Sequence, residues 1–216
     1  NIDIVFDSRT GWIRSWIVAG KEFLEKGPRL SFWRAPTHND GGYKPEGNEI
    51  SRQWVRAGLD SLQHKLKSFN QKNINGDSIV ILTKYRAQEV GNEAYIDYST
   101  KYTIYSSGKV VISTDLQPHK SIISFARVGY TMTVKSGYDN FSWYGYGPFD
   151  SYNDRHSGAR LGLYRGTVDE QFTHHVYPQE NGNKYRCSWV SLSDNSGTGL
   201  IAEGMPYIQS SAMHYS

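Results

Sequence analysis

The sequence is poor in the features that mark several large protein classes. Its 216 residues include one cysteine, Cys187, so no disulfide can form within the chain. No stretch approaches the roughly 18 apolar residues that a membrane-spanning helix needs. Residues 1–25 lack the basic-then-apolar order of a signal peptide, and the sequence is compatible with both a cytoplasmic and a periplasmic location.

An excess of charge of one sign is lacking too. The chain has 24 basic and 21 acidic residues, and no two Lys or Arg residues are adjacent. Lys65, Lys67 and Lys72 are separated by other residues, so we expect them on a solvent-exposed face. Nucleic-acid-binding proteins usually carry a clustered basic surface. We therefore expect neither a nucleic-acid partner nor a membrane partner.

What the sequence does contain is alternation of apolar and polar residues, with 14% aromatic residues and 21 glycines. Alternation of this kind is typical of β-strands. The expected strands are residues 2–6, 12–18, 78–83, 95–105, 110–114, 124–134, 171–177, 184–192 and 199–203. One segment has helical spacing and predicts a short helix over residues 49–57, ended by Gly58. The sequence thus predicts an all-β sandwich or barrel with one short helix, in a single domain of residues 1–216.

Few residues offer chemistry of their own. His174 and His175 are adjacent, so on a strand they would point to opposite faces and could not bind one metal ion. The His38–Asp40 segment has no further ligand at metal-binding spacing, so we expect no metal site. No Gly-x-Ser-x-Gly motif or phosphate-binding glycine loop is present, and Cys187 lies in an expected strand, where a buried apolar role is typical.

Polar and aromatic residues gather in the expected loops. Asp150, Asp154 and Glu180 could line a cleft, as paired glycosidase carboxylates do, or accept hydrogen bonds from turn backbones. The nearby aromatic residues suit stacking on sugar rings, and they equally suit packing in a β-sandwich. The segment from Ala35 to Asn48, with two prolines and three glycines, predicts a long loop, and loops of that length are often functional.

Three motifs carry a resemblance to a known family. They are FWRAPTHND (residues 32–40), WYGYGP (143–148) followed by Tyr152, Asp154 and Arg155, and YPQENGN (177–183). In this order and spacing they resemble the C-terminal, small-chain β-domain of β-galactosidases of glycoside hydrolase family 2. The resemblance covers essentially the whole chain. It implies a β-supersandwich of the galactose mutarotase-like type.

The resemblance also implies a function. Enzymes of this family hydrolyse terminal β-D-galactosides such as lactose with retention, and their two catalytic glutamates lie on a (β/α)₈ barrel. Such a barrel needs roughly 250 residues of alternating strands and helices, and none are seen here. The resemblance therefore implies a fragment without catalytic residues or cofactors. The Mg or Na of the parent enzyme would belong to its barrel, and that barrel would be the partner of this chain, within a possible homo-oligomer.

The resemblance assigns site residues as well. The loop after the Arg-Ala-Pro motif is implied to complete the substrate pocket, and its residues here are Arg34, His38, Asn39, Asp40 and Gly42. Trp143, Tyr146, Glu180 and Asn181 are expected to contact sugar or to fix loops. His38 departs from the family pattern, where Asp is usual, so anchoring through a carboxylate at this position is not carried over.

The ends of the chain give a further expectation. Asn1 is not a Met, and the family's domain continues for several strands beyond Ser216, so we expect a piece of a longer protein, truncated at its C-terminus. Two rival functions stay open. One is a stand-alone carbohydrate-binding or aldose-mutarotase-like module, with His156, His174 or His175 acting with Glu180. The other is a purely structural or assembly domain.

Overall fold

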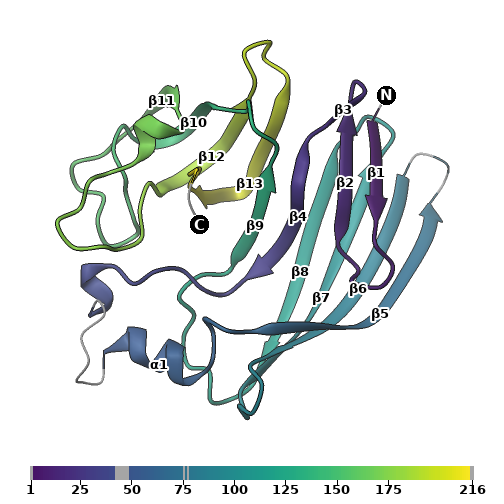
Figure 1. Ribbon diagram of the computed structural model, residues 1–216, viewed down its shortest axis with the longest axis horizontal. Coiled ribbons are helices and arrows are strands. Elements are labelled where there is room, and N and C mark those ends of the chain that lie inside the picture. The colour runs from purple at the N-terminus through teal and green to yellow at the C-terminus, as the bar shows by residue number, and fades with distance from the viewer. Residues whose placement is uncertain (1, 42–48, 75, 77, 215–216) are drawn as a thin grey trace. The chain divides into compact units, whose positions relative to one another are not determined.

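Antiparallel strands dominate the computed structural model, which describes residues 2–41, 49–74, 76 and 78–214 (Figure 1). The described residues form two compact units: unit 1 comprises those within 1–34 and 43–133, and unit 2 those within 35–42 and 134–216. In the ranges just given, no helix is long and apolar enough to cross a membrane. The all-β prediction with one short helix is confirmed, and the single domain of residues 1–216 stays a prediction.

Unit 1 contains three sheets and the helix. The elements are β1 (Ile2–Phe6), β2 (Ile13–Val18), β3 (Lys21–Glu22), β4 (Leu24–Ser31), α1 (Ile50–Arg56), β5 (Gln63–Ile74), β6 (Ser78–Gln88), β7 (Tyr95–Tyr105), β8 (Val110–Pro118) and β9 (Gly129–Val134). The strands pair as β1-β2-β3, as β4-β9 and as the meander β5-β6-β7-β8. The hairpin β1-β2 packs on this meander, since the Phe6 ring lies 5.1 Å from that of Tyr102.

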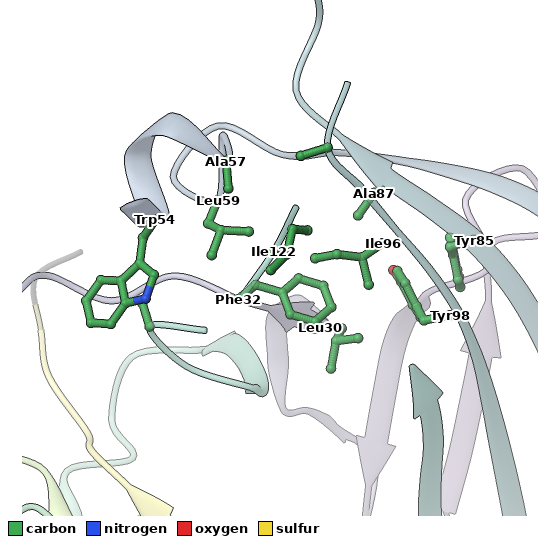
Figure 2. Packing of buried hydrophobic residues seen from close by; sticks show 12 residues of the cluster. Leu30, Phe32, Trp54, Ala57, Leu59, Tyr85, Ala87, Ile96, Tyr98 and Ile122 are labelled. Carbon is green, nitrogen blue, oxygen red and sulfur yellow. The ribbon is translucent and has the colours of Figure 1, made fainter. Parts of the chain in front are cut away.

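The core of unit 1 is built by alternation along β6 and β7. Tyr85 pairs with Tyr98 and Ala87 with Ile96, so these side chains share one face of the sheet. All four are buried, and the two tyrosine rings stack with 4.8 Å between their centroids. Figure 2 shows Phe32 in the same cluster. The polar tips are paired, because the Tyr85 hydroxyl donates to the Thr10 carbonyl at 2.9 Å.

Helix α1 ends as the sequence predicts. Gly58 has φ +69°, which an L side chain rarely adopts, and its N–H donates to the Val55 carbonyl. The Leu59 N–H donates to the Trp54 carbonyl, which completes a Schellman motif. Leu59 and Trp54 both belong to the buried core, so the cap also turns the chain into the core.

Unit 2 contains one four-stranded sheet with the order β11-β10-β12-β13. Its elements are η1 (His38–Asp40), β10 (Asn140–Gly147), β11 (Arg160–Thr167), η2 (Asp169–Gln171), β12 (Lys184–Ser193) and β13 (Gly199–Ser210). One face of this sheet carries a buried cluster of Phe141, Trp143, Val168, Cys187 and Val190.

The predicted strand over residues 171–177 is wrong. The 3-10 helix η2 occupies Asp169–Gln171, and no strand follows before β12. The backbone of Thr173 is hydrogen-bonded to a side chain instead of a neighbouring strand. Its N–H donates to the Asn181 carbonyl oxygen Oδ1 at 2.8 Å, and its carbonyl accepts from Nδ2 of the same residue. The argument that a strand separates His174 from His175 therefore does not apply.

Candidate functional site

The turn at residues 37–41 is fixed by its own side chains. The carboxylate oxygen Oδ2 of Asp40 accepts hydrogen bonds from the Thr37 N–H at 2.7 Å and from the Thr37 hydroxyl at 2.8 Å. Both residues are buried. Gly41, at φ +90°, ends the turn with its N–H on the His38 carbonyl. A charged acceptor on a backbone N–H makes this a rigid base for the loop that follows; residues 42–48, including Gly42, lie outside the described residues.

Two long-range contacts attach this turn to the rest of unit 2. The Asn39 amide donates to Oδ2 of Asp154 at 2.9 Å, and the His38 N–H donates to Oε1 of Gln179 at 3.3 Å. The His38 ring meets the Tyr177 ring edge-on, with 5.6 Å between centroids. Thus the first predicted motif is joined to the other two, although 115 and 141 residues separate the hydrogen-bonded pairs.

A small cavity of about 20 Å³ lies beneath the turn. It is lined by Thr37, His38, Asn39, Tyr152, Asp154 and Arg155. A cavity of that volume has room for about one water molecule, so it is too small for a sugar ring. The Tyr152 side chain is buried, and burial, together with the charges of Asp150 and Glu180, raises the pKa of its hydroxyl. The Tyr152 hydroxyl therefore stays protonated at neutral pH.

A buried carboxylate organises the next layer. Asp150 is 8% exposed, and its Oδ2 lies 2.7 Å from Nη2 of Arg155 and 3.3 Å from Nε2 of His175. His174, the sequence neighbour of His175, is exposed. Asp154 is exposed and bound to Asn39, whereas Glu180 is buried. In the part of the chain that the structure describes, no group of three or more His, Cys, Asp or Glu could hold a metal ion.

Lys184 lies at the start of β12 and is 1% exposed, which is exceptional for a lysine. Its Nζ donates to the Pro148 carbonyl at 3.2 Å and lies 4.6 Å from the centroid of the Trp143 ring. Burial lowers its pKa to about 8, and the charge of Asp150 opposes that shift. The sequence did not predict this burial, because the buried positions of β12 fall at residues 184, 187 and 190, a spacing set by irregular pairing with β13 rather than by alternation.

The segments at Ser151 and Asn183 are joined by a backbone and a side-chain hydrogen bond. The Ser151 N–H donates to the Asn183 backbone carbonyl at 2.7 Å, and Nδ2 of the Asn183 side chain donates to the Ser151 carbonyl at 2.7 Å. The Tyr185 N–H donates to the Ser151 hydroxyl at 3.1 Å. These bonds hold the second and third motifs together at the entrance to β12.

The remaining candidates fall into different environments. Trp143 is 2% exposed and stacks between Phe141 and Tyr164, so its ring packs in the core. Tyr146 is half-buried and lies 5.8 Å from the His156 ring. Burial raises the pKa of the Cys187 thiol to about 12, so the thiol is protonated and is no nucleophile at neutral pH. In unit 1, the Arg34 guanidinium lies 5.4 Å from the Trp54 ring centroid.

The fold and this network define a class: an all-β, sandwich-type domain whose loops, more than its strands, carry the buried polar groups. A family model described as "Beta galactosidase small chain" matches residues 1–216. The chain therefore belongs to the β-galactosidase small-chain family.

Individual relatives agree with this assignment. The chain is 33% identical over its full length to a beta-galactosidase of Priestia megaterium, of which it covers 20%. It is 29% identical over its full length to a beta-galactosidase of Lactobacillus delbrueckii subsp. bulgaricus, again covering 20%. Over 84% of its length it is 32% identical to the beta-galactosidase of Kluyveromyces lactis, of which it covers 18%. The chain thus spans about a fifth of the length of these relatives, and further domains of a parent enzyme are implied.

Proposed function

We propose that this chain is the non-catalytic small-chain part of a retaining β-galactosidase that hydrolyses terminal β-D-galactosides such as lactose. Its family and the names of its relatives support the substrate class. In this proposal the two catalytic glutamates, and any Mg or Na, belong to the barrel domain of the parent enzyme. The chain itself supplies residues that shape the substrate pocket, and it binds no cofactor.

One observation carries the proposed role, namely the anchored turn at residues 37–41. A pocket loop works only if its base is held within a fraction of an ångström, because misplaced groups lose transition-state contacts. Here Asp40 fixes the turn internally while Asn39 and His38 attach it to Asp154 and Gln179. We assign Asn39 and Asp40 to fixing the loop, and a role of Gly42 in the substrate pocket is proposed from the family motif alone.

The other proposed residues have separate roles. Asn181 fixes the backbone at Thr173, and Glu180 contributes a buried charge beside Tyr152. Trp143 supports the sheet from its core, which leaves half-buried Tyr146 as the aromatic ring better suited to touch a sugar. Arg34 stabilises the start of the loop segment through its contact with Trp54.

The test is restoration of activity. The chain alone is expected to leave a chromogenic galactoside intact, and adding the remaining domains of the parent polypeptide should restore hydrolysis. In the restored enzyme, Asp40→Ala should raise KM about tenfold, because the turn loses two hydrogen bonds to a charged acceptor. Asp115→Ala, at an exposed position on β8, is the control and should change nothing.

Two results would contradict the proposal. One is the absence of hydrolysis although the two parts associate stably. The other is rapid interconversion of galactose anomers by the chain alone, which would favour the aldose-mutarotase-like alternative. Unchanged kinetics after deletion of residues 37–47 would favour a purely structural domain.

A further inference from the structure

One face of the unit 2 sheet carries a row of apolar side chains across its strands. Leu163 on β11 is directly opposite Tyr144 on β10, and Tyr144 is directly opposite Trp189 on β12. Directly opposite residues in antiparallel strands project from the same face of the sheet. Leu161 lies two residues before Leu163 on that face, and Ile201 on β13 is opposite Ser191, two residues after Trp189. We call these five residues the apolar stripe.

Four of the five residues of the apolar stripe are exposed, and Trp189 is half-buried. Leu161, Leu163 and Ile201 are 58%, 53% and 65% exposed, and Tyr144 is exposed as well. The opposite face of the same sheet carries Trp143 and Val190 in the buried cluster of unit 2. A sheet with apolar residues on both faces is the pattern of a sheet that is covered on both faces. Within unit 2 taken by itself, the described residues bury the face that carries Trp143 and Val190.

The border of the apolar stripe is charged. Arg165 on β11 lies two residues beyond Leu163 on the same face, and Glu203 on β13 is directly opposite Trp189. Both are exposed. Tyr, Trp and Leu at the centre with charged residues at the border is the composition of protein–protein interfaces, in which large buried side chains carry most of the binding energy. Isolated exposed apolar residues need no partner, but a group that runs straight across three strands and reaches Ile201 diagonally on the fourth marks a contact surface.

We propose that the apolar stripe is the surface on which this chain docks against the remaining polypeptide of its parent enzyme, an inference that rests on the proposed function. The length of the relatives favours this occupant, because about four fifths of each lie outside the matched part. The docked surface of that polypeptide is apolar, with polar groups facing Arg165 and Glu203. The interface thereby holds unit 2, and with it the anchored turn, against the catalytic part.

The experiment measures association rather than hydrolysis. The chain and the remaining parent polypeptide are produced separately, mixed, and their Kd is measured by calorimetry. Leu163→Lys and Ile201→Lys should each weaken association about tenfold or more, because each places a charge in an apolar contact. Val90→Lys is the matched control, since Val90 is 77% exposed on the turn after β6 in unit 1, and it should leave Kd unchanged. Circular dichroism and the midpoint of urea unfolding of each variant chain should match the unsubstituted chain.

Several results would overturn the inference. Association that neither lysine substitution weakens would place the contact elsewhere. Concentration-dependent dimerisation of the chain alone, lost in Leu163→Lys, would show that a second copy covers the apolar stripe. Destabilisation of the isolated chain by both substitutions would show that its own fold covers the face. If the complete enzyme hydrolyses galactosides while amides of β11 exchange freely, the proposed function stands and the docking surface is wrong.

Discussion

The interiors of the two units differ in kind. Unit 1 is held by an apolar cluster that includes Phe32, Trp54 and Ile96, and its buried polar side chains are uncharged. Among the described residues, the buried charged side chains all belong to unit 2. They are Asp40, Asp150, Glu180 and Lys184.

This difference suggests that unit 1 contributes mainly to the free energy of folding, whereas the buried charges of unit 2 fix the positions of its loops. Apolar burial contributes a free energy of folding that grows with area and has little direction. Buried charges are costly unless every partner is in place, and such networks fix one arrangement of the groups that they join. In unit 2 the buried charged groups lie mainly in the loops that the family motifs mark, whereas the interior of unit 1 is mainly apolar.

The strongest test of the contrast truncates the unit 1 core. Phe32 is 1% exposed and contacts the rings of His64, Tyr98 and Phe125. Phe32→Ala should lower the free energy of unfolding by about 3–5 kcal/mol, because it leaves a cavity among these rings. Urea unfolding followed by circular dichroism measures the loss. Ile123→Ala, at a 74% exposed position, should cost less than about 0.5 kcal/mol, and equal losses would refute the assignment of the core.

A pH titration sharpens the same comparison. Burial, aided by the charge of Arg29, lowers the pKa of His64 to about 4 in unit 1, against 6.5 in the unfolded chain. The unfolded state therefore binds more protons between these values. The contribution of neutral His64 to stability is fully present above about pH 6.5 and is lost as the pH falls, and the loss reaches about 3 kcal/mol near pH 4.

Unfolding measured from pH 8 to pH 4 tests this slope, and His64→Phe should reduce it. Lys184 in unit 2, whose pKa is about 8, changes its protonation only near the top of this window, so the slope below about pH 7 reports on His64. An unchanged slope in His64→Phe would mean that other groups cause the acid sensitivity.

Removal of a buried charge should be costly in unit 2. Asp150→Ala leaves Arg155 and His175 without their shared acceptor and leaves Lys184 without a neighbouring negative charge. We expect a loss of about 2–3 kcal/mol in the free energy of unfolding, because the remaining buried donors would have lost their charged acceptor. Chemical unfolding measures it, with Asp115→Ala as the exposed control; a loss equal to that of the control would show that the network adds no stability.

The smallest effect concerns the anchored turn. Asn39→Ala removes the bond to Asp154 and should cost about 0.5–1 kcal/mol of stability, because the bond is exposed. In the restored enzyme it should raise KM by a few-fold, and kinetics on a chromogenic galactoside would measure this. Asn153→Ala, at the neighbouring exposed position, is the matched control. Equal effects of the two substitutions would show that the Asn39 bond does not position the loop.

Alternation predicted the strands well where one face is buried. The bounds of β7 match the prediction, because Ile96, Tyr98 and Tyr102 point inward at every second position. Strands without that signal were missed. The strand β5 is rich in Lys, Asn and Gln, β4 contains Gly27 and Pro28, and β10 mixes glycines with aromatics. β11 was missed as well, and the predicted strand over residues 124–134 begins at Gly129.

The site was less predictable than the fold. Motifs pointed to Asn39 and Asp40, and the hydrogen bond between Thr37 and Asp40 is local in sequence. The contact between Asn39 and Asp154 is not local in sequence, because only the folded topology brings these two turns together. The burial of Lys184 likewise depends on its packing against Trp143, which no local pattern encodes.

The single cysteine has a practical consequence. Cys187 lies fully buried in unit 2, and unit 1 has none among its residues in the sequence. A thiol reagent can therefore modify the chain only when β12 opens. The rate of modification therefore measures how often the sheet of unit 2 opens, without a contribution from unit 1, which contains no thiol.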